Sequence, residues 1–241
     1  MTVQFYAESF SPFCERARWA LDHHGISYRE VEQVPMLAEI TLRIGVRRFR
    51  GPVTVPLLVT VGERIMSSHE IARWAERHGT GSPLFLPAET DELEHWITVS
   101  DQVMNSGRAL LLARMMTDDG ALSEQLPRRV PGWLRRPLRG LSRMGVIHLR
   151  RKYSGSSRPL EEHERELRAR LEDIRVRTCT RIRADGAPSF SYADITLAAS
   201  LQFVCPVADS YVQLGPATRA AWNHPALALE FADLLEWRDR T

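Results

Sequence analysis

Ser11 and Cys14, close to the N-terminus, are the residues whose types and spacing point most directly to chemistry. They stand in Ser11-Pro12-Phe13-Cys14, after an alternating apolar run and before an amphipathic run that ends near His24. Proline suits the first turn of a helix and serine suits the N-cap, so a helix is predicted to begin here. The positive end of a helix dipole favours a thiolate. A capping serine beside a small buried cysteine fits the same four residues, so both interpretations stay open.

The elements that must position these residues alternate in type through the first third of the chain. Strands are predicted at 3–6, 27–31, 55–61 and 64–66, and helices at 13–24, 36–44 and 70–77, of which 36–44 has the weakest pattern. The last two strands are joined by a Gly62-Glu63 turn and form a predicted hairpin. Either Ser67 or Ser68 is expected to cap the helix that follows. This order predicts a small α/β domain over residues 1–80.

Residues 79–87 have the glycine, serine and proline content of a linker and indicate a domain boundary near residue 85. Everything beyond the linker has helical periodicity, most clearly at 90–116, 161–182, 195–199, 216–221 and 225–240. Ser191-Tyr192-Ala193-Asp194 is a capping-box pattern in which aspartate replaces the more usual glutamate or glutamine. The sequence therefore predicts an all-helical domain over 90–241, with an arginine-rich insert around 117–160.

Within that insert, residues 125–160 hold ten basic residues and no carboxylate, and apolar residues such as Trp133 and Met144 are interleaved with them. The prolines and glycines of this segment are expected to break any long helix. A solvated surface excursion between two helices explains the segment most simply. It also suits a lid that contacts an anionic substrate, or a patch that rests on an anionic membrane surface.

Composition excludes several classes of protein. The 241 residues are 44% hydrophobic and 26% charged with a net charge of +2, which is ordinary for a globular protein and gives no argument for nucleic-acid binding. Three cysteines without a C-x-x-C pair argue against a disulfide scaffold and for a reducing compartment. Neither a signal-peptide pattern nor a membrane-spanning apolar run is visible, so a cytoplasmic protein is expected. His24, His69 and His163 lack metal-ligand spacing, and we expect surface histidines and no metal.

Four short motifs, taken in order, resemble the glutathione S-transferase family, and most closely its tau- and omega-like branches. They are Ser11-Pro12-Phe13-Cys14-Glu15-Arg16, Val55-Pro56-Leu57-Leu58, Ser67-Ser68-His69-Glu70-Ile71, and the segment from Ser191 to Ala199. The resemblance implies a thioredoxin-like N-terminal domain followed by an all-helical C-terminal domain, an α/β plus all-α protein. It also implies glutathione as co-substrate, a small hydrophobic electrophile as second substrate, and a homodimer.

The family's functional positions fall on particular residues of this chain. Val55-Pro56 is similar to the cis-proline segment, whose backbone pairs with the cysteinyl part of glutathione. Ser68 is similar to the serine that holds the γ-glutamyl carboxylate at a helix N-terminus. Phe13 and Ser67 complete the implied binding residues. Ser11 is similar to the tau-class catalytic serine, whose hydroxyl stabilises the glutathione thiolate, the nucleophile of the reaction.

Two other residues compete with Ser11 for the catalytic role. Tyr6 ends the first strand, near where some branches keep a catalytic tyrosine, although the loop length fits poorly. Cys14 has no first cysteine for dithiol exchange and suits the core.

The chain departs from the family pattern at the positions that would bind the two ends of glutathione. Ser67 stands where glutamate or glutamine is usual, and Val53-Thr54 stands where a basic residue is usual, with Arg47, Arg48 and Arg50 displaced upstream. These departures leave three functions open. They are a transferase that uses glutathione or another small thiol, a scaffold that kept the fold without the chemistry, and a binder of anionic ligands or membrane surfaces through the insert.

Overall fold

The computed structural model describes residues 3–33, 42–43, 53–126, 131–153, 158–183 and 190–241. They form two compact units, one within Met1–Trp96 and Ser189–Ala199 and the other within Ile97–Pro188 and Ser200–Thr241. The strands belong to the first unit, and in the described part of the second unit the regular elements are helices. The division into domains at 1–80 and 90–241 stays a prediction.

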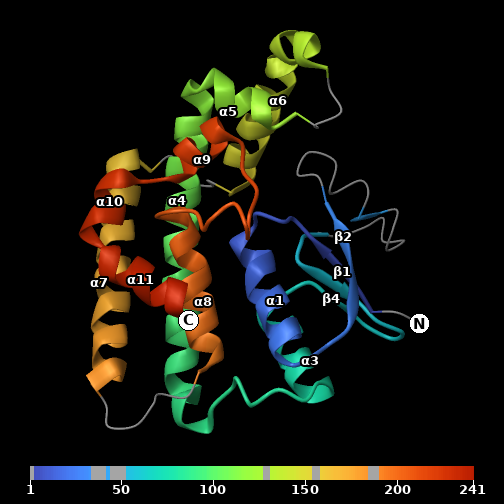
Figure 1. The fold of residues 1–241 in the computed structure, drawn as a ribbon, viewed down its shortest axis with the longest axis vertical. Helices are drawn as coiled ribbons and strands as arrows, with labels where there is room; N and C mark the ends of the chain where they lie inside the picture. The colour runs from blue at the N-terminus through green and yellow to red at the C-terminus, as the bar shows by residue number, and fades with distance from the viewer. Residues whose placement is uncertain (1–2, 34–41, 44–52, 127–130, 154–157, 184–189) are drawn as a thin grey trace. The chain divides into compact units, whose positions relative to one another are not determined.

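A four-stranded sheet forms the centre of the first unit (Figure 1). Its strands are β1 (Val3–Ala7), β2 (Tyr28–Glu32), β3 (Leu57–Val59) and β4 (Arg64–Ile65), in the order β2-β1-β3-β4. β1 and β2 are parallel, and the other two neighbouring pairs are antiparallel. The predicted hairpin is confirmed, and the Thr60 N–H donates to the Glu63 carbonyl across its turn at 3.0 Å. The helix predicted at 36–44 lies outside the described residues except for helical Leu42 and Arg43.

Helices α1 (Pro12–His23) and α3 (Ser68–His78) pack together on one face of this sheet (Figure 1). Alternation along β1 turns Phe5 and Ala7 toward the helices. The buried cluster between sheet and helices consists of Phe5, Ala7, Cys14, Ala17, Leu21, Leu58, Ile71, Trp74 and Ala75. Tyr6 and Leu57 belong to a separate buried cluster with Leu42 and Val53, because their side chains point to the other face of the strands.

Helix α1 ends at a glycine, as the sequence predicts. Gly25 has φ +65°, a conformation that residues with a Cβ rarely adopt. Its N–H donates to the Asp22 carbonyl at 3.0 Å, and the Ile26 N–H donates to the Leu21 carbonyl at 2.9 Å. These two bonds form a Schellman motif, which satisfies the last carbonyls of the helix and turns the chain toward β2.

The predicted capping box starts helix α8 (Tyr192–Ser200). One carboxylate oxygen of Asp194 accepts from both the backbone N–H and the hydroxyl of Ser191, each at 3.0 Å. Residues 190–199 pack within the first unit. There the Tyr192 N–H donates to the Leu84 carbonyl at 2.8 Å, and the Tyr192 ring stacks on Phe85 with 5.0 Å between centroids.

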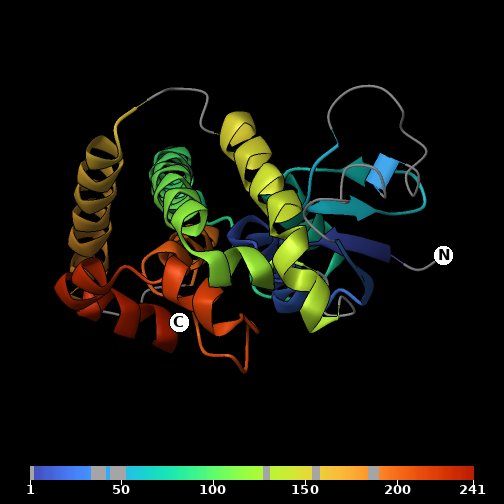
Figure 2. The same cartoon turned by 90° about the horizontal axis from the view of Figure 1, so that it is seen from above.

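Helices make up the described part of the second unit (Figures 1 and 2). They are α4 (Thr90–Thr117, of which the first turns belong to the first unit), α5 (Asp119–Glu124), α6 (Gly132–Tyr153), α7 (Leu160–Arg183), α9 (Pro216–Trp222), α10 (Pro225–Glu230) and α11 (Ala232–Arg240), with a short 3-10 turn at Leu201–Phe203. Another 3-10 turn, Pro87–Glu89, precedes α4 in the first unit. Both views show α4 and α7 side by side. Buried Ser106 on α4 joins them, because its hydroxyl donates to Glu166 at 2.9 Å and lies 3.3 Å from Nδ1 of His163.

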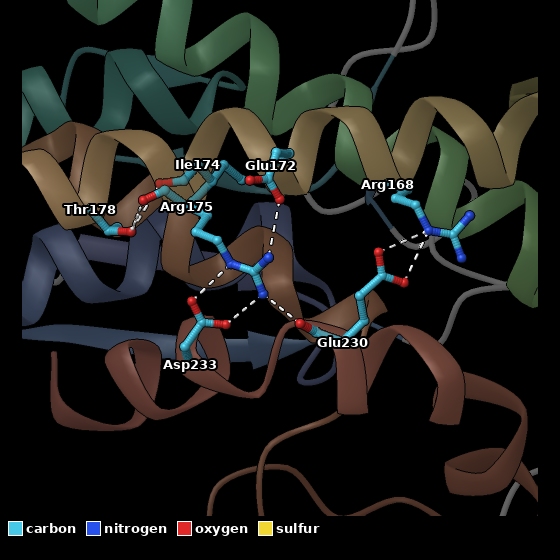
Figure 3. A network of polar contacts seen from close by, with 7 residues as sticks. All are labelled: Arg168, Glu172, Ile174, Arg175, Thr178, Glu230 and Asp233. Atoms are coloured by element: carbon cyan, nitrogen blue, oxygen red, sulfur yellow. Dashed lines mark hydrogen bonds and ion pairs between the residues drawn. The ribbon is translucent and has the colours of Figure 1, made fainter.

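Ion pairs attach the C-terminal helices to α7 (Figure 3). Nε and Nη2 of Arg175 donate to the two carboxylate oxygens of Asp233 at 2.9 and 2.7 Å, and Nη2 also donates to the Glu230 carbonyl. Nε of Arg168 donates to the Glu230 carboxylate at 3.0 and 3.1 Å. A bidentate contact such as that between Arg175 and Asp233 fixes orientation as well as distance, so α10 and α11 are held in register along α7.

The expectation that the insert contains no long helix is wrong. Helix α6 runs through 22 residues, with Pro137 inside it. The other prolines of the segment lie outside its ends, and Pro137 leaves one backbone hydrogen bond of the helix unmade. Gly140 and Gly145 also lie inside the helix. Packing against α5 stabilises the helix despite these residues.

Candidate functional site

The strand register brings three chain segments to one edge of the sheet. β1 ends at this edge, since Tyr6 pairs with Leu57 at the beginning of antiparallel β3. β4 ends there as well, because Ile65 pairs with Leu58. The segments that leave or enter this edge are the start of α1, the Val55–Pro56 peptide and the start of α3. Sequence-predicted residues Ser11, Phe13, Val55, Pro56, Ser67 and Ser68 are thus gathered at the same edge.

Ser11 is the N-cap of α1, half-buried, and its side chain makes no capping hydrogen bond. The hydroxyl instead interacts with the Cys14 thiol three residues on. Pro12, at the first helical position, has no N–H that would need a cap. The hydroxyl is therefore held at the positive end of α1 without being committed to the helix backbone.

Cys14 is a fully buried core residue between the sheet and α1. Burial raises the pKa of its thiol to about 12, and the backbone N–H of Glu8, 3.4 Å from Sγ, only partly opposes this. At neutral pH the group is a thiol and not a thiolate, so it lacks the nucleophilic form. The core interpretation of Cys14 is confirmed.

Tyr6 faces away from the start of α1. Its ring belongs to the cluster on the other side of the sheet, and its hydroxyl donates to Gln4 Oε1 at 2.9 Å. The side chain is 8% exposed. Because successive residues of a strand point to opposite faces, Tyr6 and the helix that carries Ser11 are separated by the sheet itself.

The peptide bond between Val55 and Pro56 is cis, as the resemblance implies. Pro56 is buried, and half-buried Val55 packs against both apolar clusters of the unit. Val53, at a position where the resemblance implies a basic residue, is 3% exposed and belongs to the core. Arg47, Arg48 and Arg50 lie outside the described residues.

The structure decides which serine caps α3. Ser67 is the N-cap, and its hydroxyl accepts from the Glu70 N–H at 3.4 Å. Ser68 is the first residue of the helix, half-buried beside N–H groups that have no partner within the helix. A hydroxyl and several N–H groups at a helix N-terminus form a favourable place for a carboxylate.

Two arginines of this unit, Arg16 and Arg73, were not predicted from the sequence to belong to the site. Arg16, in the second turn of α1, is 2% exposed, and its guanidinium lies over the Phe13 ring, 5.4 Å from the centroid. Nε of Arg73 donates to Nε2 of His69 at 2.8 Å. Burial and the positive charge of Arg73 lower the pKa of His69. The sequence shows an arginine in the second turn after a capping serine, but its spacing does not indicate that the side chain is buried.

The expectation of surface histidines is wrong for several positions. His24 is 1% exposed at the end of α1, and His163 is 9% exposed between α4 and α7. Half-buried His69 lies against the rings of Phe85 and Tyr192. Gly79 and Gly81 lie against His24, and Ser106 lies against His163, so residues of other segments surround these histidines, which sequence spacing does not reveal. In the part of the chain that the structure describes, no group of three or more histidine, cysteine, aspartate or glutamate residues is placed to hold a metal ion.

Residues 10–78 match the family model of the glutathione S-transferase N-terminal domain. Among solved structures, omega 3C glutathione transferase from Trametes versicolor aligns with a TM-score of 0.51 and 17% identity over 98% of this chain and 85% of its own. A glutathione transferase family member from Pseudomonas fluorescens Pf-5, with bound S-(propanoic acid)-glutathione, aligns at 0.57 and 13% over 99% and 93%. A glutathione S-transferase from Methylobacterium radiotolerans, in complex with glutathione sulfonate, aligns at 0.55 and 16% over 98% and 90%. No curated protein sequence matches the chain.

The chain therefore carries a glutathione S-transferase N-terminal domain and, over its whole length, the fold of that family. This confirms the resemblance seen in the motifs, and with it the thioredoxin-like domain followed by helices. The likeness to the tau and omega branches stays a prediction. No helix in the described part of the chain is both long and apolar enough to cross a bilayer.

Proposed function

We propose that this protein is a glutathione-dependent transferase that activates the glutathione thiol through Ser11. One observation carries the proposal: the register of β1, β3 and β4 brings the Ser11 hydroxyl, which does not cap α1, to the same edge as the Val55–Pro56 peptide and the start of α3. A tripeptide bound along that edge has a place for its sulfur, its backbone and its γ-glutamyl carboxylate. Two of the solved structures of this fold contain glutathione derivatives.

The chemistry follows from the position of Ser11. A hydroxyl that donates to sulfur, together with the N-terminus of α1, stabilises the thiolate over the thiol. The neutral Cys14 thiol accepts hydrogen bonds weakly, so an anionic sulfur is the better acceptor for the Ser11 hydroxyl. The thiolate then attacks an electrophilic carbon, a carbon–sulfur bond forms, and the bond to the leaving group breaks. Phe13, half-buried in the first turn of α1, is an apolar surface at this edge.

Substitution of Ser11 with alanine tests the mechanism. We expect kcat/KM for glutathione conjugation to fall roughly 10- to 100-fold, because a hydrogen bond to a charged group contributes about 1.5–3 kcal/mol. The pKa of bound glutathione, followed by thiolate absorbance, is expected to rise by about one to two units. The Kd for glutathione, measured by calorimetry at a pH below the pKa of the bound thiol, should change little.

Ser9→Ala is the matched control. Ser9 is an exposed serine two residues upstream, and its hydroxyl donates to Glu32 at 3.2 Å. This variant should keep wild-type kinetics. Unchanged turnover and thiolate pKa in Ser11→Ala would remove Ser11 from the mechanism.

Two residues expected to hold the ends of glutathione depart from the family pattern. These departures favour one rival function, a scaffold without thiol chemistry. Ser67 uses its hydroxyl to cap α3, and Val53 is buried in the core, so neither offers a charged contact. Calorimetry with glutathione separates the two functions. Binding with turnover of model electrophiles supports the transferase, and absence of binding supports the scaffold.

Assembly and location complete the proposal. We propose a homodimer, as the family resemblance implies, and a location in the cytoplasm. The three cysteines are free, which suits a reducing compartment. Sedimentation velocity over a range of concentrations tests the dimer, and a single monomer boundary at all of them would refute it.

A further inference from the structure

Helix α6 presents apolar side chains to solvent. Trp133, Leu141 and Met144 are 76%, 51% and 67% exposed. Their spacing of eight and three residues places them along one face of a helix, and exposed Pro137, Gly140 and His148 lie on the same face. We call this face the α6 stripe. Ser142 and Val146, on the other side of the helix, are buried, so the helix packs through one face and exposes a second apolar one.

The packed side of α6 is well anchored. α6 packs against α5. Arg139 forms an ion pair with Asp119 at 2.5 Å, and Nη2 of Arg143 donates to the Met116 carbonyl at 3.4 Å. The exposure of the α6 stripe is therefore a property of a packed helix and not of an undocked one.

The charge around the α6 stripe is of one sign. The stretch from 125 to 160 has ten basic residues and no carboxylate. Arg150 lies on the side of the helix next to the stripe, and Arg151 lies at the C-terminal end of the stripe. Both are exposed, and among the described residues neither has a carboxylate partner. An acidic surface would therefore meet unopposed positive charge here.

We propose that α6 docks this protein on an anionic lipid bilayer, with the α6 stripe in the boundary between headgroups and acyl chains and the arginines on the lipid headgroups. Tryptophan, leucine and methionine beside arginine is the composition of an interfacial helix. A second copy of the chain fits the charge less well, because a two-fold pairing through this face would oppose like charges. The docking is independent of thiol chemistry and goes beyond the proposed transferase.

Vesicle flotation with the full chain tests the proposal. We expect binding to phosphatidylcholine vesicles that contain about 30 mole per cent phosphatidylserine, and little binding to phosphatidylcholine alone. Binding should be lost when salt rises from about 0.1 M to about 1 M, because the Debye length falls from about 10 Å to about 3 Å.

Two double variants separate the apolar and the charged contributions. Trp133→Ser with Met144→Ser removes most of the α6 stripe, and Arg150→Glu with Arg151→Glu reverses the charge. Each arginine removed should lower the partition coefficient roughly fivefold, and charge reversal more than that. Matched controls are Val176→Ser with Leu229→Ser, which are 61% and 83% exposed on other helices, and Arg77→Glu with Arg165→Glu, also exposed elsewhere.

The outcomes are distinct. Salt-sensitive binding to acidic vesicles that both α6 variants lose and both controls keep supports the proposal. No binding to acidic vesicles, equal binding to neutral ones, or equal losses in the controls overturns it. Sedimentation that shows a dimer dissolved by the α6 stripe variant, without vesicle binding, would make this face a contact between copies and also overturns it. Glutathione binding by the same variants, measured by calorimetry, stays a separate readout of the proposed transferase.

Discussion

At the scale of single residues, Ser11 and Cys14 divide two roles that their spacing alone left open. Both stand at the positive end of α1, which would favour a thiolate at either place. Cys14 is turned into the core, where burial outweighs the helix dipole and keeps its proton on. Ser11 stays half-buried at the edge. Burial, not position in the helix, separates the two.

This difference predicts the reactivity of the cysteines. With its pKa raised to about 12, Cys14 has a negligible thiolate fraction at pH 7–8, and it is also inaccessible. Cys179 is exposed. In native protein, iodoacetamide should modify Cys179 well before Cys14, as read by peptide mass spectrometry, and Cys14 should react readily only after unfolding in denaturant. Modification of both at similar rates in the native state would contradict the burial of Cys14.

At the scale of elements, caps decide where the helices begin and end. Ser67 caps α3 through its hydroxyl, the Ser191–Asp194 box starts α8, and a left-handed glycine ends α1. Each of these follows from local chemistry. The glycine and the box were visible as patterns of neighbouring residues, whereas the sequence offered either Ser67 or Ser68 as the cap of α3. The cap at Ser67 makes Ser68 the first residue of the helix.

Gly25→Ala should lower the free energy of unfolding by about 1–2 kcal/mol, because alanine at φ +65° is strained. Gly140→Ala is the matched control, since a Cβ there meets no atom within 4 Å and the glycine lies inside α6. Alanine at that position should be neutral or stabilise by up to about 1 kcal/mol. Urea unfolding measures both, and equal effects of the two substitutions would argue against the left-handed cap.

At the scale of the whole molecule, buried histidines connect stability to pH. The pKa values of His24, His69, His163 and His224 are lowered, in each case chiefly by burial. His163 is faced by Ser106 from α4, by Glu162 and Glu166 from the first turns of α7, and by Arg158, which precedes α7. The positive charge of Arg158 adds to the effect of burial on the pKa of His163. The folded protein thus binds fewer protons than the unfolded chain just below pH 6.5.

The sign of the pH dependence follows directly. Stability is fully present above the unfolded pKa of 6.5 and is lost as pH falls through the lowered pKa values of the folded state. Each histidine contributes up to about 1.4 kcal/mol per pH unit to the slope. Urea unfolding from pH 7.5 to 5.5 should show the fall. His163→Gln, in which an amide can still pair with Ser106, should reduce the slope, and an unchanged slope would show that His163 does not take part.

The local features of the fold were predictable from the sequence. The order of strands and helices in the first domain, the β3–β4 hairpin, the glycine after α1 and the capping box of α8 all depend on residues within a few positions of one another. Periodicity, turn residues and caps record such short-range preferences directly. The order of four weak motifs then indicated the family, which the match over residues 10–78 supports.

Only the tertiary structure decided which residues meet. Strand order and register bring Ser11, Val55 and Ser68 to one edge, place Tyr6 on the other side of the sheet, and bury Cys14 and His24. The tertiary structure also shows that the insert forms the long helix α6, with Trp133 and Met144 exposed. Burial and register come from contacts between residues far apart in the chain. Short-range patterns therefore predicted the elements and their caps, while the chemical state of each side chain was set by the packing around it.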